Sequence, residues 1–116
     1  MIARHWKGWT HPQNADAYET LLKDHVLPAL SMLEGYQGGY ILRRDIITTT
    51  GPEVEFIVLN FFDSLDAVRR FAGPDFTTPV FEPEARALLK RVEPFADHFD
   101  VHANTLTGVS HKPHLS

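Results

Sequence analysis

Apolar residues recur along the chain in two periods, and the longer period predicts one long helix. Between residues 18 and 33 they recur at steps of three and four, which is the pattern of a single apolar stripe on an α-helix. The members of this stripe are Tyr18, Leu21, Leu22, His25, Val26, Ala29, Leu30 and Leu33. We expect Asn14 to cap this helix and Gly35 to end it. Pro28 predicts a kink or a break, because proline lacks a backbone N–H and collides with the preceding turn.

Four other segments have the composition and patterning of strands. They are residues 2–9, 36–47, 54–62 and 95–103. Gly38 and Gly39 weaken the second of these and indicate a bulge or the close approach of a bulky group. If the turn after it centres near residues 49–50, Arg44 lies opposite Glu55 and forms a cross-strand ion pair.

Two short helices are expected between the third strand and the last. Asp63 or Ser64 is placed to cap the first, which runs to about Ala72. Pro83 is well placed to begin the second, over residues 84–91. The irregular segment 73–82 between them is either a plain connector or a lid that closes a cavity.

This order of elements predicts an α+β fold, a ferredoxin-like βαββαβ sandwich with a four-stranded antiparallel sheet and helices on one face. The strand at 54–62 is apolar on both of its faces, however. One face carries Val54, Phe56, Val58 and Phe62, and the other carries Ile57, Leu59 and Phe61. Helices cover only one side of such a sheet, so we expect a homodimer that buries the other side.

Composition narrows the class of protein without naming it. The 116 residues suit one domain, which we assign to residues 1–103, followed by a polar tail at 104–116. A net charge of −4 without a basic patch argues against nucleic acid as a partner, and the absence of cysteine excludes disulfides and thiolate metal sites. No segment suits a membrane span or a signal peptide, so we expect a cytoplasmic protein with no membrane partner.

Three stretches of the chain resemble the antibiotic biosynthesis monooxygenase domain. They are IARHWKG at residues 2–8, LEGYQGGYILRR at 33–44, and EFIVL at 55–59 followed by DSLDA at 63–67. The resemblance covers about residues 1–103. It implies a dimeric α/β barrel, in which the sheets of two subunits face each other.

The resemblance leaves the activity open, because relatives with this fold differ in function. Some are cofactor-free oxygenases of polycyclic phenols, some degrade haem, and others have signalling or unknown roles. The haem-degrading relatives use an Asn, a Trp and a His where this chain has Trp6, Phe71 and Phe81. Since the histidine ligand is missing, haem degradation is the third reading, and the resemblance points first to a cofactor-independent monooxygenase. The alternative is a non-catalytic barrel that binds a small apolar ligand or acts in a stress response.

Cofactor-free oxygenation requires an apolar cavity with aromatic walls and a few polar groups that bind and deprotonate a phenol. The polar candidates are Arg4 to hold a phenolate, His25 as a base and Asn60 to bind a carbonyl. The candidates for the aromatic walls are Trp6, Tyr36, Tyr40, Phe71, Phe76 and Phe81. Each has a structural alternative. It is core packing for the aromatic residues, a core or boundary position for His25, a salt bridge or a charge at the mouth of the barrel for Arg4, and a backbone-satisfied strand end for Asn60.

Histidines in the last predicted strand raise the question of a metal. His98, Asp100 and His102 alternate on one face of this strand. Side chains two residues apart on a strand lie about 7 Å from each other, which is too far to share one ion without a bulge. We therefore expect no metal here, and we expect His111 and His114 in the tail to be solvated.

Overall fold

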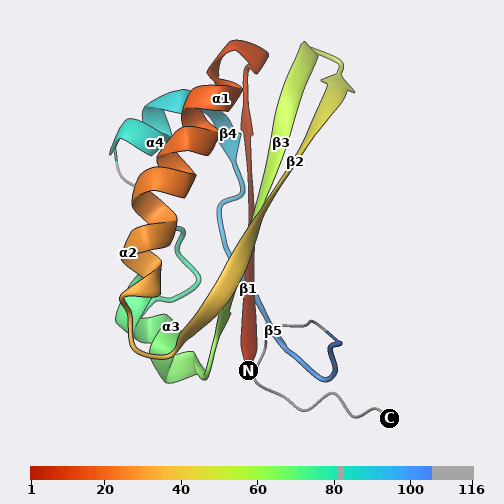
Figure 1. Ribbon diagram of the computed structural model, residues 1–116. Helices are drawn as coiled ribbons and strands as arrows, with labels where there is room; N and C mark the ends of the chain where they lie inside the picture. The colour runs from red at the N-terminus through yellow and green to blue at the C-terminus, as the bar shows by residue number, and fades with distance from the viewer. Residues whose placement is uncertain (81–82, 106–116) are drawn as a thin grey trace.

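The protein is a twisted antiparallel sheet with helices packed against one of its faces (Figure 1). The computed structural model describes residues 1–80 and 83–105. The strands are β1 (Ile2–Thr10), β2 (Tyr36–Thr48), β3 (Gly51–Phe62), β4 (Leu89–Val92) and β5 (Asp97–Asp100). The predicted α+β fold is therefore confirmed. Phe81 and residues 106–116, including His111 and His114, lie outside the described residues.

The sheet has five strands rather than the predicted four. Its order is β2-β3-β1-β4, and β5 also pairs with β1. β4 pairs with the Gly8–Thr10 end of β1 and β5 with the Ile2–His5 end, so two short strands share one edge. The prediction that residues 89–91 are helical is wrong. These residues extend the sheet instead, where Leu89 is buried in the core and Arg91 stacks on the Trp9 ring at 3.8 Å.

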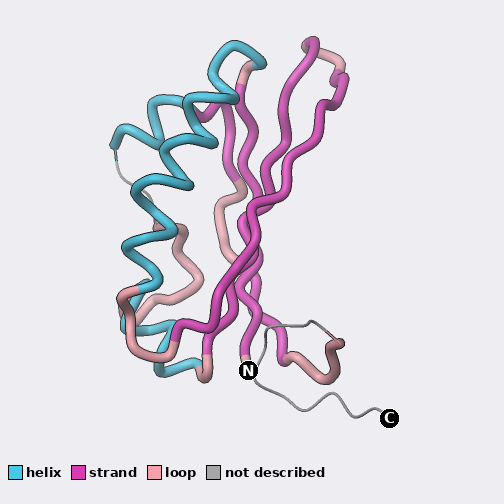
Figure 2. Tube along the Cα trace, in the orientation of Figure 1, coloured by secondary structure: helices cyan, strands magenta, loops and turns pink. Residues whose placement is uncertain are grey.

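The long N-terminal helix passes through a widened turn instead of breaking at Pro28. It consists of α1 (Pro12–Leu21), the π-helical turn η1 (Leu22–Val26) and α2 (Leu27–Ser31), which form one continuous run in Figure 2. The N–H of Leu27 donates to the carbonyl of Leu22, five residues back. Since Pro28 cannot donate and its ring crowds the preceding turn, the wider turn accommodates it without ending the helix.

The capping predictions have mixed outcomes. Helix α1 begins at Pro12 and its N-cap is His11, so the prediction of Asn14 as the cap is wrong. Helix α3 (Leu65–Ala72) begins after Ser64, whose hydroxyl accepts a hydrogen bond from the Ala67 N–H at 3.2 Å, as predicted. Helix α4 (Pro83–Leu88) begins at its proline, also as predicted. None of the helices described is long and apolar enough to cross a membrane.

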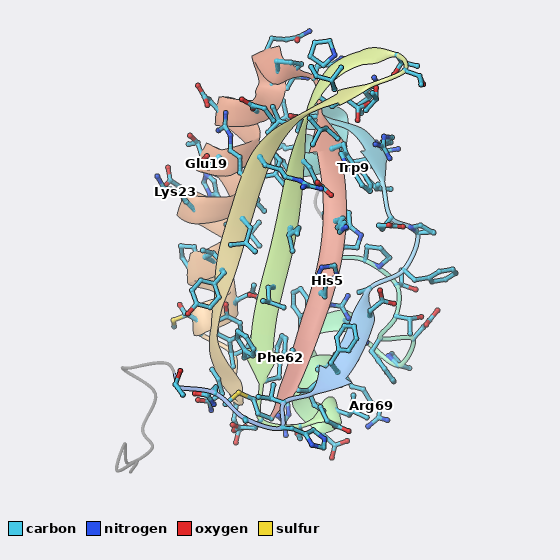
Figure 3. The ribbon with its side chains drawn as sticks, turned by 90° about the vertical axis from the view of Figure 1, so that its right-hand side faces the viewer. His5, Trp9, Glu19, Lys23, Phe62 and Arg69 are labelled. Atoms are coloured by element: carbon cyan, nitrogen blue, oxygen red, sulfur yellow. The ribbon has the colours of Figure 1, made fainter. Side chains whose placement is uncertain are left out.

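The second face of the sheet, which we call the outer face, is turned toward the viewer in Figure 3 and carries no helix. The register places Ile57, Leu59 and Phe61 of β3 on this face, each half-buried. Beside them, Tyr40 is 44% exposed and Phe99 is 57% exposed. Large apolar side chains therefore cover the middle and one end of the outer face.

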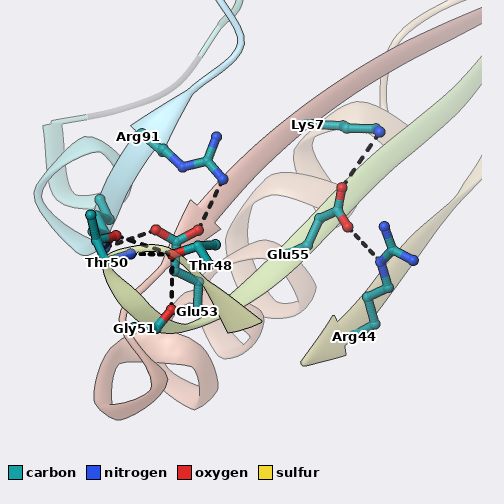
Figure 4. Close-up of polar contacts among 9 residues, drawn as sticks. Lys7, Arg44, Thr48, Thr50, Gly51, Glu53, Glu55 and Arg91 are labelled. Atoms are coloured by element: carbon teal, nitrogen blue, oxygen red, sulfur yellow. Dashed lines mark hydrogen bonds and ion pairs between the residues drawn. The ribbon is translucent and has the colours of Figure 1, made fainter. Parts of the chain in front are cut away.

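Ion pairs occupy the other end of the outer face (Figure 4). Glu55 receives a hydrogen bond from the Arg44 Nε at 2.5 Å and lies 3.4 Å from the Lys7 Nζ, which confirms the predicted cross-strand pair. Burial alone would raise the pKa of Glu55, but the Arg44 hydrogen bond and charge, together with Lys7, hold this pKa below its ordinary value.

Glu53 forms the neighbouring cluster. Its carboxylate is almost completely buried and lies 2.9 Å from the Arg91 Nη2 and 2.8 Å from the Lys90 Nζ. The hydrogen bond from Arg91, and then that from Lys90, lower the pKa of Glu53. Glu53 and Glu55 are thus held ionised by cations from β1, β2 and β4.

These lowered pKa values predict that the protein loses stability in acid. A carboxyl group whose folded pKa lies below its ordinary 4.5 stabilises the fold fully above that pH, and the stabilisation is lost as the pH falls toward the folded pKa. We expect the free energy of unfolding in urea to decrease as the pH falls below about 5. The double variant Glu53→Gln/Glu55→Gln should show a flatter pH profile. An unchanged slope in that variant would contradict the role given to these two groups.

Candidate functional site

A small cavity lies between the helix-covered face of the sheet and the helical run α1–η1–α2. Its volume is about 60 Å³, and its walls come from both clusters of the hydrophobic core, for example Trp6 of one and Leu30 of the other. Its polar lining comes chiefly from Arg4, Asn60 and Tyr18. We call this space the inner cavity.

An outer groove of about 330 Å³ adjoins the inner cavity. The two spaces share four walls, which are Val26, Leu30, Phe71 and Val80. His25 and Arg70 line the groove but not the inner cavity. The inner cavity and the outer groove are therefore neighbours, separated by these shared side chains.

Arg4 brings a positive charge to the inner cavity from the Ile2–His5 end of β1. It is only 4% exposed. Its guanidinium donates to the carbonyls of Phe76 and Thr78, the latter at 2.9 Å, and contacts the Nε2 of His98 at 2.9 Å. Its carbon lies 5.5 Å from the centre of the Phe71 ring. Burial lowers the pKa of Arg4 to about 10, so the group is still a cation at neutral pH.

Arg4 has no acidic partner within residues 1–80 and 83–105, so the salt bridge considered as its structural alternative is absent there. Its described contacts are two carbonyls, an aromatic face and an imidazole. Burial, and then the charge of Arg4, lower the pKa of His98, so its ring is neutral and accepts from Arg4. No three potential ligands for a metal come together in the described part of the chain.

Asn60 faces the inner cavity from β3, directly across the sheet from Arg4. Its Oδ1 accepts a hydrogen bond from the Tyr36 hydroxyl at 2.7 Å, and this leaves the Nδ2 as the free end of the amide. Burial raises the pKa of Tyr36 to about 12, so its hydroxyl is protonated and donates at neutral pH. Tyr36 therefore orients the amide of Asn60 and is not itself a wall of the inner cavity.

Gly39 makes the contact between Tyr36 and Asn60 possible. A Cβ on Gly39 would lie 2.2 Å from the Asn60 Oδ1, 2.8 Å from the Tyr36 hydroxyl and 2.7 Å from the Leu59 carbonyl oxygen. The register of β2 against β3 shifts at Gly38, whose φ of +114° suits glycine. The bulge and the close approach predicted from Gly38 and Gly39 are both present.

Tyr18 was missed as a site residue by the sequence analysis, which assigned it to the apolar stripe of the helix. Its ring packs edge-on against Phe56 at 4.9 Å, but it also lines the inner cavity. Its hydroxyl forms no hydrogen bond with any described residue, although Tyr18 is only 2% exposed. A lone tyrosine in a stripe of aliphatic residues was the signal available in the sequence.

The remaining predicted residues are divided among several places. Trp6 and Phe71 line the inner cavity, and the Trp6 Nε1 donates to the Glu93 carbonyl at 2.9 Å. Phe76 packs against the edge of His98 at 5.0 Å and is not among the described walls. Tyr40 lies on the outer face beside Phe61, so the structure does not bring it to the cavity as predicted.

The segment after α3 closes one side of the inner cavity, where Pro79 and Val80 contribute to the wall. Asp75 accepts hydrogen bonds at 2.9 Å from the hydroxyls of Thr77 and Thr78, and these bonds fold the segment back on itself. Together with the two carbonyls bound to Arg4, they tie this segment to β1. Its movement as a lid stays a prediction.

The chain matches no protein-family model and no curated protein. Its fold is nevertheless similar to that of a solved structure from Deinococcus radiodurans, named as a "putative antibiotic biosynthesis monooxygenase". The two structures superpose with a TM-score of 0.58 and 15% sequence identity, over 93% of this chain and 100% of the other. The antibiotic biosynthesis monooxygenase fold expected from the sequence is confirmed by this similarity.

Proposed function

We propose that this protein is a cofactor-independent monooxygenase that acts on a flat aromatic or quinol-type small molecule. The observation that carries the proposal is the combination of an apolar cavity with a buried guanidinium and an oriented amide inside it. Arg4 stabilises the substrate as a phenolate, and Asn60 binds an oxygen of the same ring. The fold is similar to that of a structure named as a "putative antibiotic biosynthesis monooxygenase", which supports the oxygenase part of this proposal.

The reaction balances without a cofactor. The phenolate is electron-rich and transfers electrons to dioxygen. One oxygen atom then enters the ring and the other leaves as water with two hydrogens from the substrate. For 1-naphthol, the products are 1,4-naphthoquinone and one water. The protein supplies a dry site, a cation that favours the phenolate, and an amide that fixes the ring.

His25 is proposed as the group that takes up the proton on the outer side of the site. It lines the outer groove and is exposed to solvent, so it can pass a proton to bulk water. It does not line the inner cavity, where Arg4 and Asn60 lie. A substrate that extends through the groove is the one that His25 can reach.

We also propose that the protein is a homodimer joined through its outer faces. The apolar side chains there, among them Leu59, Phe61 and Phe99, are large and partly exposed in the single chain. A second copy of the chain can cover these side chains, because a two-fold axis brings the same apolar patch of both subunits together and buries both patches. This arrangement is the dimeric barrel expected from the sequence.

Oxygen uptake with 1-naphthol and a panel of substituted naphthols and hydroquinones tests the activity. We expect uptake above the protein-free rate and ¹⁸O from labelled dioxygen in the quinone product. The variant Arg4→Met should lower kcat/KM by about 100-fold, because it removes the charge that favours the phenolate. Arg86→Met, at an exposed position on α4, is the matched control and should keep full activity. Tight binding of these compounds with no oxygen uptake would reject the oxygenase and support a binding protein.

A further inference from the structure

The polar groups of the inner cavity can form more hydrogen bonds than the described residues offer them. Arg4 has five N–H donors and directs three of them to the Phe76 and Thr78 carbonyls and to His98. The Nδ2 of Asn60 donates to no described residue, because only its Oδ1 is engaged. The hydroxyl of Tyr18 has no described partner at all.

The hydroxyl of Tyr18 is not sealed in the core, because the one fully buried side-chain polar atom without a partner among the described residues is the Thr10 Oγ1. The Tyr18 hydroxyl is therefore open to the inner cavity that its side chain lines, and it is free to bond to a molecule there. The packing of the ring against Phe56 would be equally well served by phenylalanine. Burial raises the pKa of Tyr18, so the hydroxyl is a protonated donor at neutral pH. Its place among the walls of the inner cavity means that a molecule bound there can supply the missing partner.

All three groups are donors, and one of them carries a charge. No Asp or Glu is among the described residues that line the inner cavity. We infer that Arg4, Asn60 and Tyr18 together bind the ionised oxygen of a small organic acid with a flat apolar body, which makes Tyr18 a third ligand-binding residue of the site. This inference rests on the proposed function in placing the substrate in this cavity, and it narrows the substrate to one that is bound as an anion.

The sizes of the two spaces fix how such an acid is bound. The inner cavity, at about 60 Å³, takes the oxygen-bearing end of a molecule but not an aromatic ring system. The outer groove, at about 330 Å³, is large enough for the rings and is lined mainly by apolar side chains. The body of the ligand therefore lies along Phe71 and Val26 between α2 and α3, and its charged end points inward to Arg4.

Calorimetric titration of the full chain with 2-naphthoate and with its neutral isostere 2-naphthamide tests the inference. We expect the wild type to bind the acid at least about tenfold more tightly than the amide, because charge-assisted hydrogen bonds are about twice as strong as neutral ones. Tyr18→Phe should weaken binding of the acid by about tenfold while the thermal unfolding curve stays unchanged. Arg4→Gln should abolish the preference for the acid, and Arg86→Gln should leave it intact.

Three outcomes would overturn the inference. They are equal binding of the two compounds by the wild type, unchanged binding of the acid by folded Tyr18→Phe, and no binding of the acid at all. These results are independent of oxygen chemistry. A preference for the acid without oxygen uptake would contradict the proposed oxygenase activity but not the anion site. Oxygen uptake with neutral and acidic naphthols that bind with equal affinity would contradict the anion site but not the activity.

Discussion

Replacing Leu59 with glutamate is expected to separate the proposed homodimer into folded monomers. Leu59 lies near the middle of the apolar part of the outer face, between Ile57 and Phe61 on β3. In a two-fold interface the substitution places two new carboxylates in a patch from which water is excluded. Light scattering after gel filtration should show the molar mass of one chain for the variant and of two chains for the wild type.

The control for this experiment lies on the opposite side of the molecule. Met32, which follows α2, is 85% exposed, so Met32→Glu changes the charge equally without touching the outer face. We expect this variant to remain dimeric. A wild type that is monomeric at micromolar concentration, or a Leu59→Glu variant that stays dimeric, would refute the interface. Circular dichroism of Leu59→Glu should show an intact fold, because the side chain is only half-buried in the single chain.

Replacing Gly39 with alanine is expected to destabilise the fold by about 2–3 kcal/mol and to disrupt the candidate site. The new Cβ would lie 2.7 Å from the Leu59 carbonyl oxygen, which is backbone and cannot easily move away. It would also occupy the space in which Tyr36 reaches Asn60. Urea unfolding measures the first effect, and loss of 2-naphthoate binding measures the second.

A double-mutant cycle distinguishes this crowding from ordinary backbone strain. Tyr36→Phe should cost about 1 kcal/mol in the wild type, since it removes one hydrogen bond, and almost nothing once Gly39→Ala has displaced Asn60. Gly38→Ala is the matched control, because a Cβ there meets no atom within 4 Å and the substitution adds only the strain of a positive φ. In the Gly38→Ala variant, Tyr36→Phe should still lower the free energy of unfolding by about 1 kcal/mol. An equal cost in all three backgrounds would rule out the proposed role of Gly39.

The main elements of the fold could be predicted because their periodicities are strong and local. The stripe at 18–33 and the two-faced strand at 54–62 correspond to α1–η1–α2 and β3. The four residues of β4 could not be found in this way. Leu89–Val92 continue a helical pattern in the sequence, and only distant partners, Trp9 and Glu53, favour the extended form.

The candidate site was predictable where a polar residue interrupts an apolar strand, which is the case for Arg4 and Asn60. The aromatic residues were harder to place because a bulge changes which face each residue occupies. Tyr36 and Tyr40 are four residues apart and would share a face of a regular strand. The register shift at Gly38 places Tyr36 beside Asn60 and Tyr40 on the outer face instead.

The widened turn η1 has a consequence for how the helix lines the site. Tyr18, Leu22, Val26 and Leu30 are spaced by four residues, and all four line the inner cavity. In a regular α-helix each residue advances about 100° around the axis, so each step of four overshoots a full turn by about 40°. Three such steps would rotate Leu30 about 120° away from the direction of Tyr18. The extra residue in the turn η1 reduces this rotation, because a wider turn takes more residues to go once around the axis. The four side chains therefore stay on the side of the helix that faces the cavity.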